Sequence, residues 1–165
     1  MNRLPALLAA ALISTSSVAT AHAAPPTTGR FLWPLIPRPA ISNAFDPPER
    51  DWLPGHRGVD LAGAEGQAVH AVGDGVVVFA GTVAGKPVVS VEHSNGLRST
   101  YEPVLATLTA GARIRAGDVL GLLQAGHPGC AEPCLHWGLR RDRVYLDPLG
   151  LLGATPIRLK PLTAD

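Results

Sequence analysis

The sequence has few charged residues and almost no net charge. Lys and Arg number 14 and Asp and Glu number 13 in 165 residues, so the formal charge is +1 at pH 7. A chain without a basic field does not attract nucleic acid or an acidic membrane surface at long range, and we expect no nucleic-acid partner. Charged residues make up 16% and hydrophobic residues 46%, which favours a folded domain over a disordered chain.

Aromatic residues are also scarce, at 5%, whereas Gly (18) and Pro (16) are abundant. This composition is typical of short strands joined by tight turns and argues against a helical bundle. We therefore predict an all-β fold, a compact sandwich or barrel. Asp147 before Pro148 is the one helical signal, an N-cap followed by Pro at the first position. The candidate strands, each bounded by Gly, Pro, Asn or Asp, are 68–72, 76–80, 88–93, 97–101, 119–123 and 135–140.

No hydrophobic run is long enough to span a membrane. The longest, residues 4–13, is short of the ~20 residues that a spanning helix needs. It follows Arg3 and precedes the small-x-small sequence 21–23, which is the pattern of a cleaved secretory signal peptide over residues 1–23. We expect a secreted protein of the cell wall or periplasm with no stable membrane insertion after cleavage; an uncleaved anchor is the alternative.

Cysteine is limited to two residues, Cys130 and Cys134. Exported proteins meet an oxidising compartment, and a Cys-x-x-x-Cys turn can bring two Cα atoms within bridging distance. We expect a local disulfide that stiffens the turn before Leu135. In the alternative, Cys134 is a thiolate ligand of a closed metal site.

The prolines divide the chain into segments. Residues 24–54 are rich in Pro and are predicted to form a lead-in without regular structure, held against the domain surface by aromatic side chains. Residues 55–153 form the domain, and residues 154–165 form a tail. The aromatic residues expected to hold the lead-in are Phe31, Trp33, Phe45 and Trp52.

Two distant segments carry residues suited to a metal. His56 and Asp60 are four apart, so on a strand they share a face. In the second segment, residues 134–140, the alternation of apolar and other residues places Trp137 toward the core and His136 on the opposite face. Together the three polar residues would form the His/His/carboxylate set of catalytic zinc sites, which leave a fourth position open. The alternative for His56 and Asp60 is a surface hydrogen-bonded pair.

With these residues, the chain resembles the lysostaphin-type zinc metallopeptidases, which cut peptide cross-links of bacterial peptidoglycan. The resemblance implies an antiparallel β fold, one zinc ion held by His56, Asp60 and His136, and stem or cross-bridge peptides of peptidoglycan as substrate. We also expect a monomer. The matching motifs are His56-Arg57-Gly58-Val59-Asp60-Leu61, Gly66-x-x-Val69-x-Ala71, Asp74-Gly75-x-Val77, His93-x-Asn95-Gly96, Thr100-Tyr101, Gly117-x-x-Leu120-Gly121, Leu135-His136 and Asp147-Pro148.

The chain also departs from this family. Pro103 and Cys134 stand where the family has its two catalytic helper histidines, and Gly138 stands where it has an acidic residue. His127, on the loop before the cysteines, is our candidate replacement for a helper; the alternative is an exposed loop histidine. Tyr101 either stabilises an oxyanion or packs.

Other titratable residues are given smaller roles. Glu102 and Glu132 are weaker candidates for proton transfer. His93 is expected to orient neighbouring groups, and His70 to have no metal role.

Three functions fit the sequence. The first is a secreted zinc endopeptidase of peptidoglycan, with weakened or altered catalysis. The second is a non-catalytic domain that binds peptidoglycan or regulates its hydrolases. The third is a plain secreted β domain without a metal.

Overall fold

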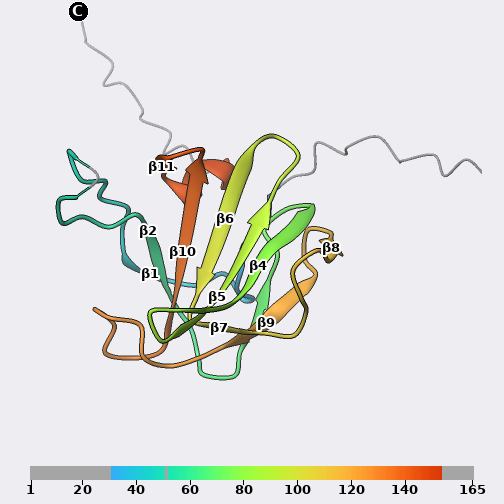
Figure 1. Cartoon of the computed structure of the whole chain (residues 1–165). Helices are drawn as coiled ribbons and strands as arrows, with labels where there is room; N and C mark the ends of the chain where they lie inside the picture. Colours follow the sequence, from blue (N-terminus) through green and yellow to red (C-terminus); the bar gives the residue numbers. More distant parts are fainter. Residues whose placement is uncertain (1–30, 51, 154–165) are drawn as a thin grey trace, which may run out of the picture.

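The computed structural model describes residues 31–50 and 52–153, and these residues form two antiparallel sheets (Figure 1). The all-β prediction is confirmed. The larger sheet has eight strands: β1 (Ile41–Asn43), β2 (Gly58–Ala62), β10 (Cys134–Arg141), β6 (Leu97–Glu102), β5 (Lys86–Glu92), β4 (Gly75–Val83) and β8 (Arg113–Ile114) in spatial order, with β11 (Val144–Leu146) paired to β10. The smaller sheet has β3 (Ala68–His70), β9 (Val119–Leu123) and β7 (Val104–Ala106).

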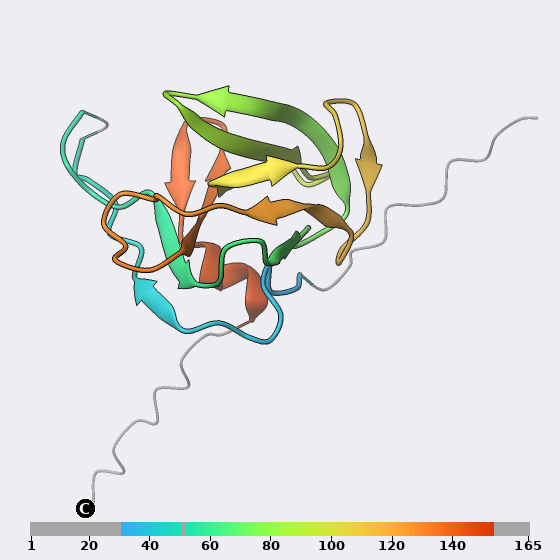
Figure 2. The same ribbon diagram turned by 90° about the horizontal axis from the view of Figure 1, so that it is seen from below.

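The hydrophobic core forms where the smaller sheet lies against one face of the larger one (Figure 2). Strand β10 shows how the sequence produces this arrangement. Leu135, Trp137 and Leu139 are all buried, whereas His136 and Arg140 lie on the other face and keep partial contact with solvent. The alternation predicted for this strand is confirmed, and it leaves one face of the larger sheet free for polar residues.

The Pro-rich segment contributes to the fold, and the prediction that it lacks regular structure is wrong. Its residues 41–43 form β1, which pairs with β2, and Leu35 is fully buried in the core. The prolines flank this short run without interrupting it, so the backbone N–H groups of the strand are kept. Phe31, Trp33 and Phe45 pack against the core as expected.

Trp52 does not join the other three aromatic residues. Its side chain is 76% exposed, and the guanidinium of Arg50 lies 5.6 Å from the centre of its ring. The expectation that Trp52 holds the segment against the domain is therefore wrong.

The helical signal is confirmed as one short 3-10 helix, η1 (Pro148–Leu152). The side chain of Asp147 accepts a hydrogen bond from the backbone N–H of Leu149 at 2.9 Å, as an N-cap does. The helix packs its leucines against the core next to β2 and β10. No helix within 31–50 and 52–153 has the length and apolar character to cross a membrane. The predicted signal peptide (1–23) and tail (154–165) lie outside the described residues.

Candidate metal centre

Pairing of β2 with β10 brings together the two distant segments that carry the candidate metal ligands. Asp60 of β2 lies directly opposite His136 of β10 in the antiparallel register. His56 precedes β2 and is fixed by two backbone hydrogen bonds to Asp46, at 2.7 and 3.0 Å. Since facing residues of an antiparallel pair project from the same face, both side chains reach the outer face of the larger sheet.

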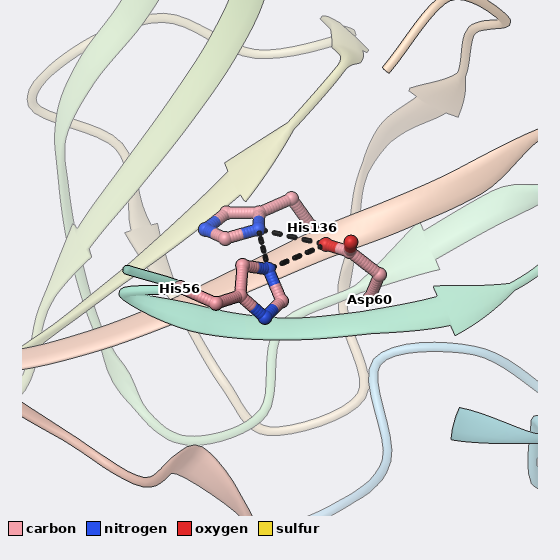
Figure 3. Close-up of side chains that lie close together, drawn as sticks. All are labelled: His56, Asp60 and His136. Atoms are coloured by element: carbon pink, nitrogen blue, oxygen red, sulfur yellow. Dashed lines mark hydrogen bonds and ion pairs between the residues drawn. The ribbon is translucent and has the colours of Figure 1, made fainter. Parts of the chain in front are cut away.

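The three side chains point toward one another (Figure 3). Nδ1 of His136 lies 2.8 Å from Oδ1 of Asp60, and Nε2 of His56 lies 3.0 Å from the same oxygen. The two nitrogens are 3.1 Å apart. Tetrahedral zinc with ligands at about 2.05 Å places two ligand atoms about 3.3 Å apart, so the donor type and the spacing fit this ion.

Two neighbouring backbone groups position the histidine rings. The carbonyl oxygen of Ala44 accepts a hydrogen bond from Nδ1 of His56 at 2.6 Å, which leaves Nε2 as the free lone pair facing Asp60. Gly58 provides room for His136, because a Cβ at this position would lie 2.7 Å from Nε2 of that ring. Ala44 belongs to the Pro-rich segment, and nothing in its sequence indicated this role.

Asp60 is kept as a carboxylate by its surroundings. The residue is 1% exposed, and this burial alone would favour the neutral acid. Hydrogen bonds from His127 and His136, together with the charges that His56 and His136 carry when protonated, outweigh burial and hold the pKa of Asp60 far below its usual range. The carboxyl group is therefore in the ionised form that a cation requires.

His127 lies at the same centre. Its ring stacks on the ring of His136 with centroids 5.1 Å apart, and its side chain is 11% exposed. Nε2 is 3.4 Å from Oδ1 of Asp60, and Nδ1 is 3.4 Å from Oε1 of Glu102. The ring thus lies between the carboxylates of Asp60 and Glu102, and it is not the exposed loop histidine of our alternative.

Glu102 reaches the centre because β6 pairs with β10 on the side away from β2. It lies opposite His136, and its Oε1 also accepts from Nζ of Lys86 at 2.8 Å. The alternation of β6, with Tyr101 buried, was a signal for this placement. Glu132, the other weaker candidate, is an exposed residue of the loop.

The disulfide between Cys130 and Cys134 is present, with the Cα atoms 6.3 Å apart. Asp60 and the two sulfurs lie close enough to resemble a metal-binding group. Because both sulfurs are bonded to each other, the alternative of Cys134 as a thiolate ligand is excluded. The bridge ties the loop that carries His127 to the start of β10.

Tyr101 does not face the centre, and its catalytic role is corrected. It is fully buried beside Trp137, and its hydroxyl oxygen accepts a hydrogen bond from the backbone N–H of Val72 at 3.2 Å. Burial raises the pKa of Tyr101 to about 12. The packing role is the one that its position supports.

The other two histidines within residues 31–50 and 52–153 are not part of the candidate metal group. His93 is buried, with Nδ1 2.8 Å from the carbonyl of Asp74 and Nε2 2.7 Å from the hydroxyl of Ser99. His70 is fixed by the carbonyl of Gly117 at 2.9 Å. His93 thus contacts two neighbouring groups, in line with the orienting role expected for it; that His70 has no metal role stays a prediction.

Comparison with protein families gives a match to one family model, described as Peptidase family M23, over residues 54–148. This range covers more than half of the chain and contains all three residues of the metal centre.

Two relatives extend the comparison. An uncharacterized protein of Mycobacterium tuberculosis strain H37Rv is 52% identical over 157 residues, which is 92% of this chain and 62% of the relative. The DD-carboxypeptidase/endopeptidase Mpg of Neisseria meningitidis strain MC58 is 32% identical over 103 residues, 61% of this chain and 24% of the relative. The chain therefore spans less than two thirds of the length of either protein.

A solved structure shows the same fold. The catalytic domain of the antimicrobial peptidase lysostaphin from Staphylococcus simulans superimposes with a TM-score of 0.60 at 21% identity, covering 70% of this chain and 93% of that domain. The antiparallel arrangement of the two sheets is therefore one that a solved peptidase domain also adopts.

Proposed function

Because the chain belongs to peptidase family M23, we propose that it is a zinc-dependent endopeptidase that hydrolyses peptide bonds of bacterial peptidoglycan. One observation carries the proposal. His56, Asp60 and His136, from segments 76 residues apart in sequence, place three ligand atoms within 3.1 Å of one another on a single polar face. A plain structural β domain has no need of this convergence.

The three residues would hold zinc through Nε2 of His56, Oδ1 of Asp60 and Nδ1 of His136. A zinc ion bound by such a set supplies Lewis-acid chemistry, which polarises a peptide carbonyl and makes water acidic enough to attack near neutral pH. The protein would contribute two things. The carbonyl of Ala44 fixes the ring of His56, and the surroundings of Asp60 keep its carboxyl group ionised.

His127 is the proposed general base and acid. Its Nε2 faces the metal centre, and its Nδ1 is buried without a hydrogen bond while the Glu102 carboxylate lies 3.4 Å away. When its proton is on Nδ1, facing Glu102, His127 would give up the hydrogen bond from Nε2 to Asp60, and Nε2 would be free to take a proton from the attacking water and return it to the leaving amine. Catalytic hydrogen bonds are often this long before substrate binds.

The proposed location follows from the substrate. Peptidoglycan lies outside the cytoplasm, and the disulfide between Cys130 and Cys134 is of the kind that persists in oxidising compartments. We place the protein in the cell wall or periplasm, with stem or cross-bridge peptides as its target.

A second function rests on a different observation. Pro103 and Cys134 occupy the positions where the resembled peptidases have helper histidines, Pro103 has no group that transfers a proton, and Cys134 is in a disulfide. This second function is a domain that binds peptidoglycan without cutting it, or that regulates a hydrolase. Such a domain would keep the polar outer face of the larger sheet but would not hydrolyse peptide bonds.

The decisive experiment measures soluble peptide products. The disulfide-intact chain, loaded with zinc, is incubated with purified peptidoglycan, and the supernatant is chromatographed. His56→Ala is the inactive comparison, and His70→Ala is the matched control because His70 lies away from the centre.

We expect new fragments from the wild type and from His70→Ala, and none from His56→Ala. Fragments from His56→Ala at the wild-type rate would overturn the metal-dependent mechanism. Absence of fragments from the wild type, while the protein still sediments with the wall, would establish the binding function in place of the enzyme.

A further inference from the structure

The outer face of the larger sheet continues beyond the metal centre as three rows of side chains. Strand pairing defines the rows, because residues that face each other across β5, β6 and β10 lie side by side. The first row contains His136 and Glu102, and it ends at the metal centre. The middle row is Gly138, Thr100 and Ser90; the third is Arg140, Arg98 and Glu92.

A groove of about 580 Å³ lies over these rows. Thr100 and Ser90 of the middle row line it, together with apolar side chains of β4 and β5. Gly138, the third residue of that row, is buried, and a Cβ there would be in ordinary contact with Arg57, Thr100 and His136. Glu102 lines the groove at the metal end, and Arg98 and Arg140 line it at the other end.

The two arginines differ in their partners. Nε of Arg98 is 2.6 Å from a carboxylate oxygen of Glu92, and both side chains are more than a third exposed. Arg140 donates only to the backbone carbonyl of Asp142, at 3.0 Å, and has no carboxylate partner among the described residues. Like charges directly opposite each other on paired strands are unfavourable unless an anion lies between them.

We propose that Arg140, assisted by Arg98, binds a carboxylate of the substrate at the end of the groove away from the metal centre. This inference rests on the proposed function and names its substrate class, a peptide with a free carboxylate. The guanidinium group suits this role because its planar donors match a carboxylate with two hydrogen bonds.

The geometry also fixes where the carboxylate lies. His136 and Arg140 are four residues apart on β10, and a strand rises about 3.3 Å per residue, so the two positions are separated by about 13 Å. A substrate extended along the groove would therefore carry its carboxylate about four residues from the scissile bond, or fewer when a long side chain bears it. An uncharged glycine chain has no group for this position.

The test uses two synthetic stem peptides that are identical except that one side-chain carboxylate is free in the first and a primary amide in the second. The zinc-loaded chain is assayed for kcat/KM on both. Binding of both is also measured by calorimetry with His127→Ala, so that recognition is observed without hydrolysis. Variants are Arg140→Gln and Arg140→Lys, with Arg141→Gln as the control because Arg141 alternates to the other side of the strand and does not line the groove.

We expect the wild type and Arg141→Gln to prefer the free carboxylate by about tenfold, the ratio that a single exposed charge-assisted hydrogen bond supports. In Arg140→Gln the preference should disappear because the KM for the peptide with the free carboxylate rises. In Arg140→Lys the preference should return in part. Equal use of both peptides by the wild type, with hydrolysis intact, would overturn this inference and leave the proposed function standing. Preferential binding without any hydrolysis would support the carboxylate site and reject the enzyme.

Discussion

The two faces of the larger sheet use the same strands for different purposes. On the inner face, Trp137 and Tyr101 face each other in full burial, and the hydroxyl of Tyr101 is paired with the backbone. On the outer face, one residue along each strand, His136 and Glu102 face each other beside Asp60. Residues that stabilise the fold therefore alternate along one strand with residues of the candidate site. Substitutions on the inner face should lower the free energy of unfolding, and substitutions on the outer face should lower activity.

The largest expected effect is on the outer face at His127. Replacing it with alanine should lower the rate of hydrolysis about 10²- to 10⁴-fold, the usual contribution of a positioned acid–base group. The free energy of unfolding should change by less than about 1 kcal/mol, because His127 does not belong to the hydrophobic core. Single-turnover hydrolysis and chemical denaturation measure the two quantities.

His70→Ala is the control for this variant, since it removes a histidine that has no access to the centre. A wild-type rate in His127→Ala would mean that the ring near Asp60 and Glu102 takes no part in proton transfer.

The disulfide lies on the outer side and should nevertheless affect both properties. Replacing Cys130 and Cys134 together with serine removes a loop closure of about five residues, which the chain-entropy relation values at about 2 kcal/mol of stability. The rate should also fall, because the bridge holds the loop that carries His127. Denaturation without reductant and a hydrolysis assay check this pair of effects.

Addition of a reductant to the wild type should reproduce the double variant and leave the variant itself unchanged. If the rate were the same with and without the bridge, the loop would be positioned by other contacts.

Tyr101→Phe tests the inner face. Loss of the hydroxyl leaves the backbone N–H of buried Val72 without its partner, which should cost about 1 to 2 kcal/mol in the free energy of unfolding. The hydrolysis rate at saturating zinc should not change. A large loss of rate with unchanged stability would return Tyr101 to the oxyanion role that its burial argues against.

The smallest effect is the pH dependence from His93. Burial lowers the pKa of His93 below its ordinary value of 6.5, so the unfolded chain binds its proton more readily than the folded chain does. This histidine costs no stability above about pH 6.5, and stability should fall as the pH drops below that value, by at most about 1.4 kcal/mol per pH unit. Denaturation curves between pH 5 and 8, recorded for the wild type and for His93→Gln, measure the slope.

His93→Gln should have a lower stability at pH 8 and a shallower slope toward pH 5. A slope identical to that of the wild type would assign the acid sensitivity to other histidines.

The sequence placed the three candidate metal ligands on one face because each segment carries its own local signal. The spacing of His56 and Asp60 and the alternation around His136 both select the same face of a strand, and alternation is a property of the backbone. The Asp147 N-cap was predictable for the same reason, since its partner is two residues away.

Contacts between distant segments were not predictable in this way. The short strands β1, β7, β8 and β11 have two or three residues each, too few for a period to be read. The hydrogen bond from His56 to Ala44 and the burial of Leu35 depend on how the Pro-rich segment returns along β2. The prolines in that segment suggested the absence of regular secondary structure, whereas they only flank its short strand, β1.

By itself, then, the sequence determined which residues are able to hold a metal and which face of each strand is polar, because both follow from residue type and from a two-residue repeat. The tertiary structure alone decided that His127 and Glu102 share the centre with Asp60, that Tyr101 turns away from it, and that Arg98 and Arg140 close the far end of one groove. These outcomes depend on strand order and register, in which β10 pairs with β2 on one side and with β6 on the other. Strand order and register are set by the packing of the whole core.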